Sequence, residues 1–150
     1  MSGDISRQCE VVANNFQWWA KTAEKYLQED SWTEGRIKFV EERFSIYERV
    51  QNGLQKNDYK LTVPGDVKAT NSDLDFRILM SVMVSGFRSK EYVHLIGIRN
   101  HLMLYRTKSK GNSFPQGCVV RGKLYPHSGK TLFAGVEFPA IRKATLVLKD

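Results

Sequence analysis

The sequence predicts an α+β protein in which two N-terminal helices precede a mainly antiparallel β-sheet. Apolar residues recur at three- and four-residue steps through the first third of the chain, which is the period of amphipathic helices. In the second half, apolar and polar residues alternate with a period of two, as in half-buried strands. We therefore expect a single domain over residues 1–150, made of a helical hairpin at 1–60, a linker at 61–73 and a basic, β-rich part at 74–150.

The first helix is predicted from one apolar face. This face consists of Val12, Phe16, Trp19, Ala23 and Tyr26, at spacings of four, three, four and three residues. An aromatic stripe of this kind is more often core than ligand site, because aromatic side chains bury large apolar areas. Four aromatic residues of the two predicted helices are expected in the core: Phe16, Trp19, Phe44 and Tyr47.

A second helix is predicted after Ser31. The segment from Ser31 to Glu34 has the S-x-x-E pattern of a capping box, which marks a helix start. Apolar residues then repeat at helical steps over residues 37–54, and Gly53 together with Asn57-Asp58 is expected to end the helix. Because residues 28–31 form a short polar joint, the two helices are expected to pack as an antiparallel hairpin.

The longest predicted strand covers residues 76–85. Its even-numbered residues are expected to point to one face: Phe76, Ile78, Met80, Val82 and Val84. Residues 92–98 fit a helix or a strand equally well, because short apolar runs are ambiguous. The remaining predicted elements are a short strand at 61–63, a turn at 64–66, and strands at 101–106, 119–125 and 144–148.

Charge is distributed unevenly along the chain, whose net charge is +7. Residues 1–85 contain 11 Lys/Arg and 13 Asp/Glu, whereas residues 86–150 contain 12 Lys/Arg and three Asp/Glu. Such asymmetry favours contact with a polyanion, either nucleic acid or an anionic membrane surface, over a merely solvated basic face. The candidate polyanion-binding residues are Arg88, Lys90, Arg106, Lys108, Lys110, Arg121, Lys123, Lys130, Arg142 and Lys143.

The stretch Gly129-Lys130-Thr131 ends like a phosphate-binding loop. That motif requires a further glycine at the position that Leu124 occupies, and Pro126 removes one of the backbone donors. We therefore interpret the stretch as a basic turn that follows a strand, rather than as a nucleotide site.

No arrangement of residues points to catalysis, a metal or a cofactor. The three histidines show no i, i+4 pairing and no HExxH pattern. Asp73 and Asp75 form one close acidic pair, which we interpret as a polar strand entry because a magnesium site usually recruits more ligands. Cys9 and Cys118 lack metal or redox spacing and are expected to be reduced thiols. We therefore expect a non-enzymatic protein without a cofactor.

Seven positions carry a resemblance to a known family. They are Gly122, Tyr125, Pro126, His127, Gly129, Lys130 and Thr131, within the sequence GKLYPHSGKT. This stretch resembles a segment of rhabdovirus matrix proteins of the vesiculovirus type, and the order of predicted strands over residues 74–150 is also similar. Two family features have no counterpart here: the lysine-rich N-terminal arm, and a PPxY or PTAP motif.

The resemblance implies a structural viral protein that self-associates and bridges a ribonucleoprotein to an anionic membrane. Such a protein is a homo-oligomer inside the host cell, peripheral to the membrane, and part of the virion. The N-terminal segment is too polar for a signal peptide, so we expect an intracellular location, in cytoplasm or nucleus. One of Trp18 and Trp32 is expected to be exposed for self-association, because large exposed aromatics tend to mark contact sites.

Two alternatives stay open. The first is an RNA- or DNA-binding protein, viral or a host-defence antagonist, that holds phosphates on the same basic residues. Aromatic residues lie next to cations at four places, as in proteins that hold single strands: Phe87-Arg88, Lys90-Tyr92, Tyr105-Arg106 and Lys123-Tyr125. The second is an adaptor that binds only protein.

Overall fold

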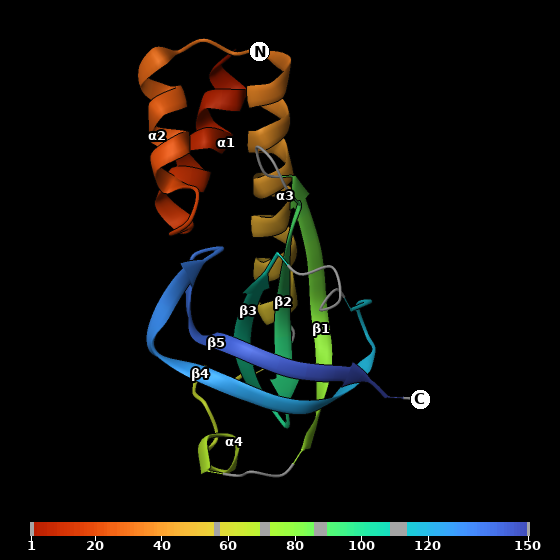
Figure 1. The fold of residues 1–150 in the computed structure, drawn as a ribbon. Helices are drawn as coiled ribbons and strands as arrows, with labels where there is room; N and C mark the ends of the chain where they lie inside the picture. The colour runs from red at the N-terminus through yellow and green to blue at the C-terminus, as the bar shows by residue number, and fades with distance from the viewer. Residues whose placement is uncertain (1, 56–57, 70–72, 86–89, 109–113, 150) are drawn as a thin grey trace. The chain divides into compact units, whose positions relative to one another are not determined.

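The computed structural model describes residues 2–55, 58–69, 73–85, 90–108 and 114–149 (Figure 1). The chain divides into two compact units. The helical unit contains Met1–Asp58 and the short segment Leu132–Glu137, and the barrel unit contains Tyr59–Thr131 and Phe138–Asp150. A piece of the C-terminal half is therefore part of the helical unit.

The helical unit contains α1 (Ser2–Asn15), α2 (Ala20–Glu29) and α3 (Glu34–Gln55). Helix α1 packs against both α2 and α3. Phe16 and Trp19 are buried, which confirms their predicted place in the core, whereas Phe44 and Tyr47 are only partly buried. The α+β class is likewise confirmed by the helices here and the sheet of the barrel unit.

The first predicted helix is in fact broken between Asn15 and Ala20. At the break, the Gln17 N–H donates to the Leu132 carbonyl oxygen at 2.9 Å, and the Leu132 N–H donates to Gln17 Oε1 at 3.2 Å. Backbone groups that a continuous helix would use internally are thus used by a distant segment. The apolar residues of this stretch thus have helical spacing, but they lie on two helices separated by a turn.

Helix α3 begins three residues later than its predicted cap. The Thr33 hydroxyl oxygen accepts a hydrogen bond from the Arg36 N–H at 3.3 Å, so Thr33 rather than Ser31 caps the helix. The helix also continues through Gly53, which was expected to end it. The short joint between α2 and α3 is present as predicted, with Asp30 in the left-handed conformation at the end of α2.

The barrel unit is built from five strands. They are β1 (Leu74–Ser85), β2 (Lys90–Ile98), β3 (His101–Thr107), β4 (Val119–Phe133) and β5 (Val136–Leu148). They close in the order β1-β2-β3-β5-β4, with β1 antiparallel to β2 and β4, and β3 parallel to β5. This is the strand plan of the OB-fold barrel. The ambiguous segment 92–98 is a strand, and a short helix, α4 (Gly65–Ala69), replaces the turn predicted at residues 64–66.

A bulge in β1 overturns the prediction that its even-numbered residues share one face. Ile78 pairs with Ile96, but Met80 pairs with Leu95, the preceding residue of β2. Because neighbouring strand residues point to opposite faces, Phe76 and Ile78 face the barrel interior, whereas Met80 and the later even positions face outward. The barrel core accordingly contains Phe76 and Ile78 but not Met80.

The stretch Gly129-Lys130-Thr131 lies inside β4 and is not the predicted turn. The real turn comes at Ala134 and Gly135, both with positive φ (53° and 81°), as in a two-residue hairpin of type I′. Strands β4 and β5 both reach this turn, so each is longer than its alternation predicted. A phosphate-binding loop must open a helix, and this stretch does not.

Candidate polyanion-binding site

Strand β4 presents a row of polar side chains on the outside of the barrel. Val120 and Leu124 belong to the core, so the alternating residues Arg121, Lys123 and Tyr125 point outward. Arg121 and Tyr125 are exposed, and Lys123 is partly exposed. Outward side chains on one strand follow one another at about 7 Å, twice the rise per residue.

Strand β5 continues this surface. The Lys149 N–H donates to the Val119 carbonyl oxygen at 2.9 Å, which aligns the end of β5 with the start of β4. Further along, Lys143 Nζ lies 5.7 Å from the centre of the Tyr125 ring. The exposed side chains of β5 therefore lie beside those of β4.

Strand β1 completes the surface on the other side of β4. Asp75 pairs with Arg121 in the β1–β4 ladder, and its outward neighbour Arg77 pairs with Val119. We call the resulting surface the basic face, defined as Asp75, Arg77, Arg121, Lys123, Tyr125, Lys143, Val147 and Lys149. The face carries five cations and the carboxylate of Asp75; with the nearby Asp73 also counted, its net charge is about +3.

Asp75 organises two of these cations. Its Oδ1 accepts from Arg121 Nε at 2.8 Å, and its Oδ2 accepts from Lys149 Nζ at 2.6 Å. The hydrogen bonds from Arg121 and then Lys149 lower the pKa of Asp75 to about 2, and the same contact raises the pKa of Arg121. At neutral pH the carboxylate is therefore ionised and holds both cations in place.

Other predicted cations lie elsewhere in the barrel unit. Arg106 donates to both carboxylate oxygens of Glu91, with Nη2–Oε1 at 2.7 Å and Nε–Oε2 at 3.1 Å. Lys108 Nζ lies 3.9 Å from the same carboxylate, so these two cations form a second group around the buried Glu91. A bidentate pair of this kind uses two of the five guanidinium N–H groups and neutralises the positive charge, which leaves Arg106 less able to bind a phosphate.

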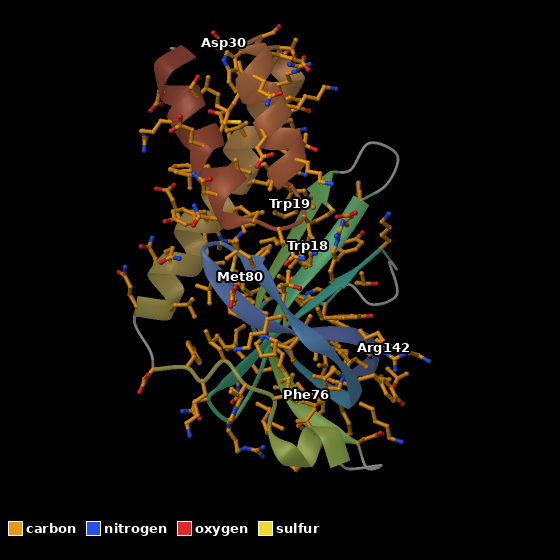
Figure 2. The ribbon with its side chains drawn as sticks, turned by 90° about the vertical axis from the view of Figure 1, so that its left-hand side faces the viewer. Trp18, Trp19, Asp30, Phe76, Met80 and Arg142 are labelled. Carbon is orange, nitrogen blue, oxygen red and sulfur yellow. The ribbon has the colours of Figure 1, made fainter. Side chains whose placement is uncertain are left out.

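The remaining candidates are exposed or lie outside the described residues. Lys90 begins β2, and Lys130 lies near the end of β4. Arg142 on β5 points away from the barrel strands (Figure 2). Arg88 and Lys110 lie outside the described residues. Of the predicted set, the structure thus brings Arg121, Lys123 and Lys143 together on the basic face.

Sequence reasoning missed three charged members of the basic face, Asp75, Arg77 and Lys149, and the apolar member Val147. Asp75 is indeed at a strand entry, but its role is to hold cations. Across the described parts of the chain, no three His, Cys, Asp or Glu side chains gather where a metal would need them. The sequence feature that could have indicated them is the two-residue alternation of β1 and β5. Once the strand pairing is known, this alternation places Asp75, Arg77 and Lys149 on the outer side of the barrel.

The two tryptophans proposed for self-association lie in the helical unit, and neither is exposed. Trp18 packs against Phe133, with ring centres 5.7 Å apart. The indole nitrogen of Trp32 donates to Asp30 Oδ1 at 3.1 Å, and this ring is partly buried. Figure 2 shows Asp30 at the end of the helical unit opposite Trp18 and Trp19. The expectation that one tryptophan is exposed is therefore wrong.

The large apolar side chains that are exposed among the described residues lie elsewhere: Met83, Tyr125, Val147 and Leu148. Val147 and Tyr125 are part of the basic face, and Leu148 follows Val147 on β5. The face therefore combines cations with exposed apolar and aromatic groups. None of the helices in the described parts of the chain is long and apolar enough to cross a bilayer.

The basic face differs from the usual ligand surface of an OB-fold barrel, which is centred on strands β2 and β3. Here the outer side of β2 and β3 is apolar and buried along its middle, at Val93 and Leu95 on β2 and at Leu102 and Leu104 on β3. These side chains offer no donor to a phosphate. Searches of known protein families, curated proteins and solved structures found no match to this chain, so its own geometry carries the functional argument.

Proposed function

We propose that the protein binds single-stranded nucleic acid on the basic face of the barrel. The observation that carries the proposal is the outward row Arg121, Lys123 and Tyr125 on β4, with Lys143 beside the tyrosine ring. Single strands are held by cations that pair with phosphates and by aromatic rings on which bases stack. The row supplies both kinds of contact on adjacent outward positions.

An exposed aromatic ring favours a single strand over a duplex. Tyr125 is exposed, and its ring stacks on a base only where the base is not already stacked within a helix. Barrels of the OB plan carry such functions in other proteins, although a fold by itself does not establish a function. Asp75 holds Arg121 and Lys149 in fixed positions and partly neutralises their charge.

A salt titration of matched variants tests this proposal. The site variant is R121Q/K123Q/K143Q, and the control variant K21Q/K25Q/K38Q removes three exposed cations from α2 and α3 of the helical unit. Binding of fluorescent single-stranded RNA, single-stranded DNA and duplex DNA is measured over a range of salt. For single strands we expect the site variant to lower the slope of log K against log salt by about two, since each lost phosphate contact contributes about 0.7.

The control variant keeps the parent slope if the contacts are local to the basic face. The proposal is overturned if the site variant binds every nucleic acid as tightly as the parent, or if both variants lose the same slope. The second result would show a general charge effect.

A second candidate function is the membrane-bridging role that the resemblance to rhabdovirus matrix proteins implies. The observation that favours it is the exposure of two consecutive apolar residues near the end of β5, Val147 (70%) on the basic face and Leu148 (49%) next to it in sequence. Apolar side chains among cations suit the boundary of an anionic membrane, because the apolar contribution is not screened by salt.

Anionic liposomes discriminate between the two candidates. For a membrane-bridging protein we expect part of the liposome association, and self-association, to survive at high salt. V147S/L148S would then remove the liposome association that survives and leave RNA binding unchanged. If liposome binding vanishes at high salt in the parent, and light scattering shows a monomer at every concentration, the membrane role is excluded.

A further inference from the structure

A pocket of about 280 Å³ opens in the barrel unit beside the basic face. Its wall is formed by β1, the end of β2, the turn after β2 and the start of β4. Six of its lining residues carry the argument: Tyr59, Asp75, Arg77, Leu79, Gly97 and Arg99. Asp75 and Arg77 also belong to the basic face, so the pocket and the face are continuous. The volume lies just below that of most ligand sites, which run from about 300 to 1,000 Å³, and suits one small ligand.

One side of the pocket is held in place by backbone contacts. The Lys60 N–H donates to the Asn100 carbonyl oxygen at 2.8 Å, and the Leu102 N–H donates to the Lys60 carbonyl oxygen at 2.9 Å. Arg99 Nη2 in turn lies 2.7 Å from Asp66 Oδ1. The turn between β2 and β3 is thus pinned to the segment that contains Tyr59, which gives the pocket a preformed wall.

Arg99 occupies a backbone conformation that rarely holds an arginine. Its φ is +56°, in the left-handed region that favours glycine or asparagine. A non-glycine residue in this conformation costs backbone free energy, which suggests that the arginine side chain has a role that offsets the cost. Arg99 also lines the pocket, which ties this strained residue to the cavity.

The lining combines two guanidinium groups with an aromatic ring. Arg77 lines the pocket and is exposed there. It forms no ion pair with any residue that the structure describes. Counting the partners of the lining residues, four cations (Arg77, Arg99, Arg121 and Lys149) face two carboxylates (Asp66 and Asp75), a net charge of about +2. Guanidinium groups bind phosphate through paired donors, and Tyr59 and Leu79 offer flat and apolar contact to a base.

We propose that this pocket holds one nucleotide of the bound strand, with its phosphate on Arg77 and Arg99 and its base against Tyr59 and Leu79. The inference rests on the proposed binding of nucleic acid and names one specific subsite for it. Gly97 leaves room for Leu79 at this wall: a Cβ there would lie 2.8 Å from Leu79 Cδ1, so the leucine side chain would have to shift.

The test uses mononucleotides as probes on the full chain. Nucleoside monophosphates, the corresponding nucleosides and inorganic phosphate are titrated separately by NMR chemical-shift mapping. We expect the monophosphate to bind with a Kd below about 1 mM, and the nucleoside and the phosphate each to bind about tenfold more weakly, because each makes only part of the contacts.

Two variants remove one guanidinium each. R77Q is expected to weaken monophosphate binding by about tenfold. R99G is expected to weaken it similarly with little change in the melting temperature, because relief of the left-handed backbone offsets the loss of the exposed Arg99–Asp66 ion pair. R142Q is the control, since Arg142 is exposed on β5 and does not line the pocket. Monophosphate binding that R77Q and R99G leave unchanged overturns the proposal.

Failure of the pocket and failure of the proposed function give different results. If oligonucleotides bind and depend on Arg121, Lys123 and Lys143, but monophosphates neither bind nor compete, the pocket proposal is wrong and the basic face stands. If monophosphates bind through Arg77 and Arg99 but no oligonucleotide binds, the pocket accepts free nucleotides. In that case the proposed function is wrong.

Discussion

Asp75 and Arg121 are joined twice, as Cα partners in the β1–β4 ladder and by a 2.8 Å hydrogen bond from Arg121 Nε to Asp75 Oδ1. Lys149 adds a third strand to the contact, because its Nζ lies 2.6 Å from Asp75 Oδ2. One carboxylate thus links the outer surfaces of β1, β4 and β5. The same carboxylate also lowers the positive charge that the basic face offers to a polyanion.

The Asp75 contact predicts a stability loss in acid. The pKa of Asp75 is lowered from 3.8 to about 2 in the folded protein. A carboxylate with a lowered folded-state pKa stabilises the fold above its unfolded pKa, and this contribution is lost as the pH falls through the folded value. We therefore expect the melting temperature of the parent to fall between about pH 4 and pH 2 by more than that of D75N. Identical pH profiles would contradict the role given to Asp75.

The same substitution is expected to strengthen polyanion binding. D75N removes a negative charge from the basic face and frees Arg121 and Lys149 to meet phosphates. We expect single-stranded RNA to bind D75N more tightly at neutral pH and low salt, with a salt slope raised by up to about one. The matched control is D4N, which removes a carboxylate that pairs with Arg7 in the helical unit, away from the basic face and the pocket. Weaker binding by D75N would show that the carboxylate itself contributes to the site.

Gly122 is predicted to be irreplaceable in β4. A Cβ at this position would clash with the carbonyl oxygen of Thr145, which is backbone and cannot move aside. We expect G122A to lose at least about 3 kcal/mol of unfolding free energy or to fail to fold. G53A is the control, because Gly53 lies in α3 with open space around it, and alanine should stabilise that helix by about 0.5–1 kcal/mol. Equal stabilities of the two variants would refute the clash.

Phe133 is predicted to be the main anchor of the β4–β5 turn in the helical unit. Its ring centre lies 5.1 Å from that of Phe16, 5.7 Å from Trp18 and 6.0 Å from Trp19. We expect F133A to cost about 3–5 kcal/mol of unfolding free energy, as for other buried aromatic residues, and to shift tryptophan fluorescence to longer wavelength. V147A, at an exposed site, should change stability by less than about 0.5 kcal/mol.

The two cysteines are predicted to differ in reactivity. Cys9 is fully buried, and burial raises the pKa of its thiol to about 11. Cys118 is partly exposed, and burial raises the pKa of its thiol as well. We expect iodoacetamide at mildly alkaline pH to label Cys118 first and to reach Cys9 only on unfolding, as measured by mass spectrometry of peptides. Equal labelling in the folded protein would contradict the burial of Cys9.

Local patterns in the sequence determined the class of the fold and most of its segments. The helical steps of residues 37–54 and the alternation around residues 76–85 and 101–106 each reflect contacts between near neighbours, and the structure has a helix and two strands there. The same alternation placed Arg121 and Lys123 on one side of a strand. Their charge and spacing were therefore predictable before their surroundings were known.

Tertiary structure decided the features that depend on distant partners. Closure of the barrel requires β3 to pair with β5, and the bulge at Leu79 appears only in the register with β2. The break after Asn15 likewise exists because Leu132 supplies hydrogen bonds to Gln17.

The same holds for the basic face. Asp75 meets Arg121 and Lys149 only after three strands pair, across 46 and 74 positions of the sequence. Local periodicity specifies which way a side chain points relative to its neighbours along the chain. It does not specify which strand lies alongside, because strand pairing is settled by burial and hydrogen bonding over the whole barrel.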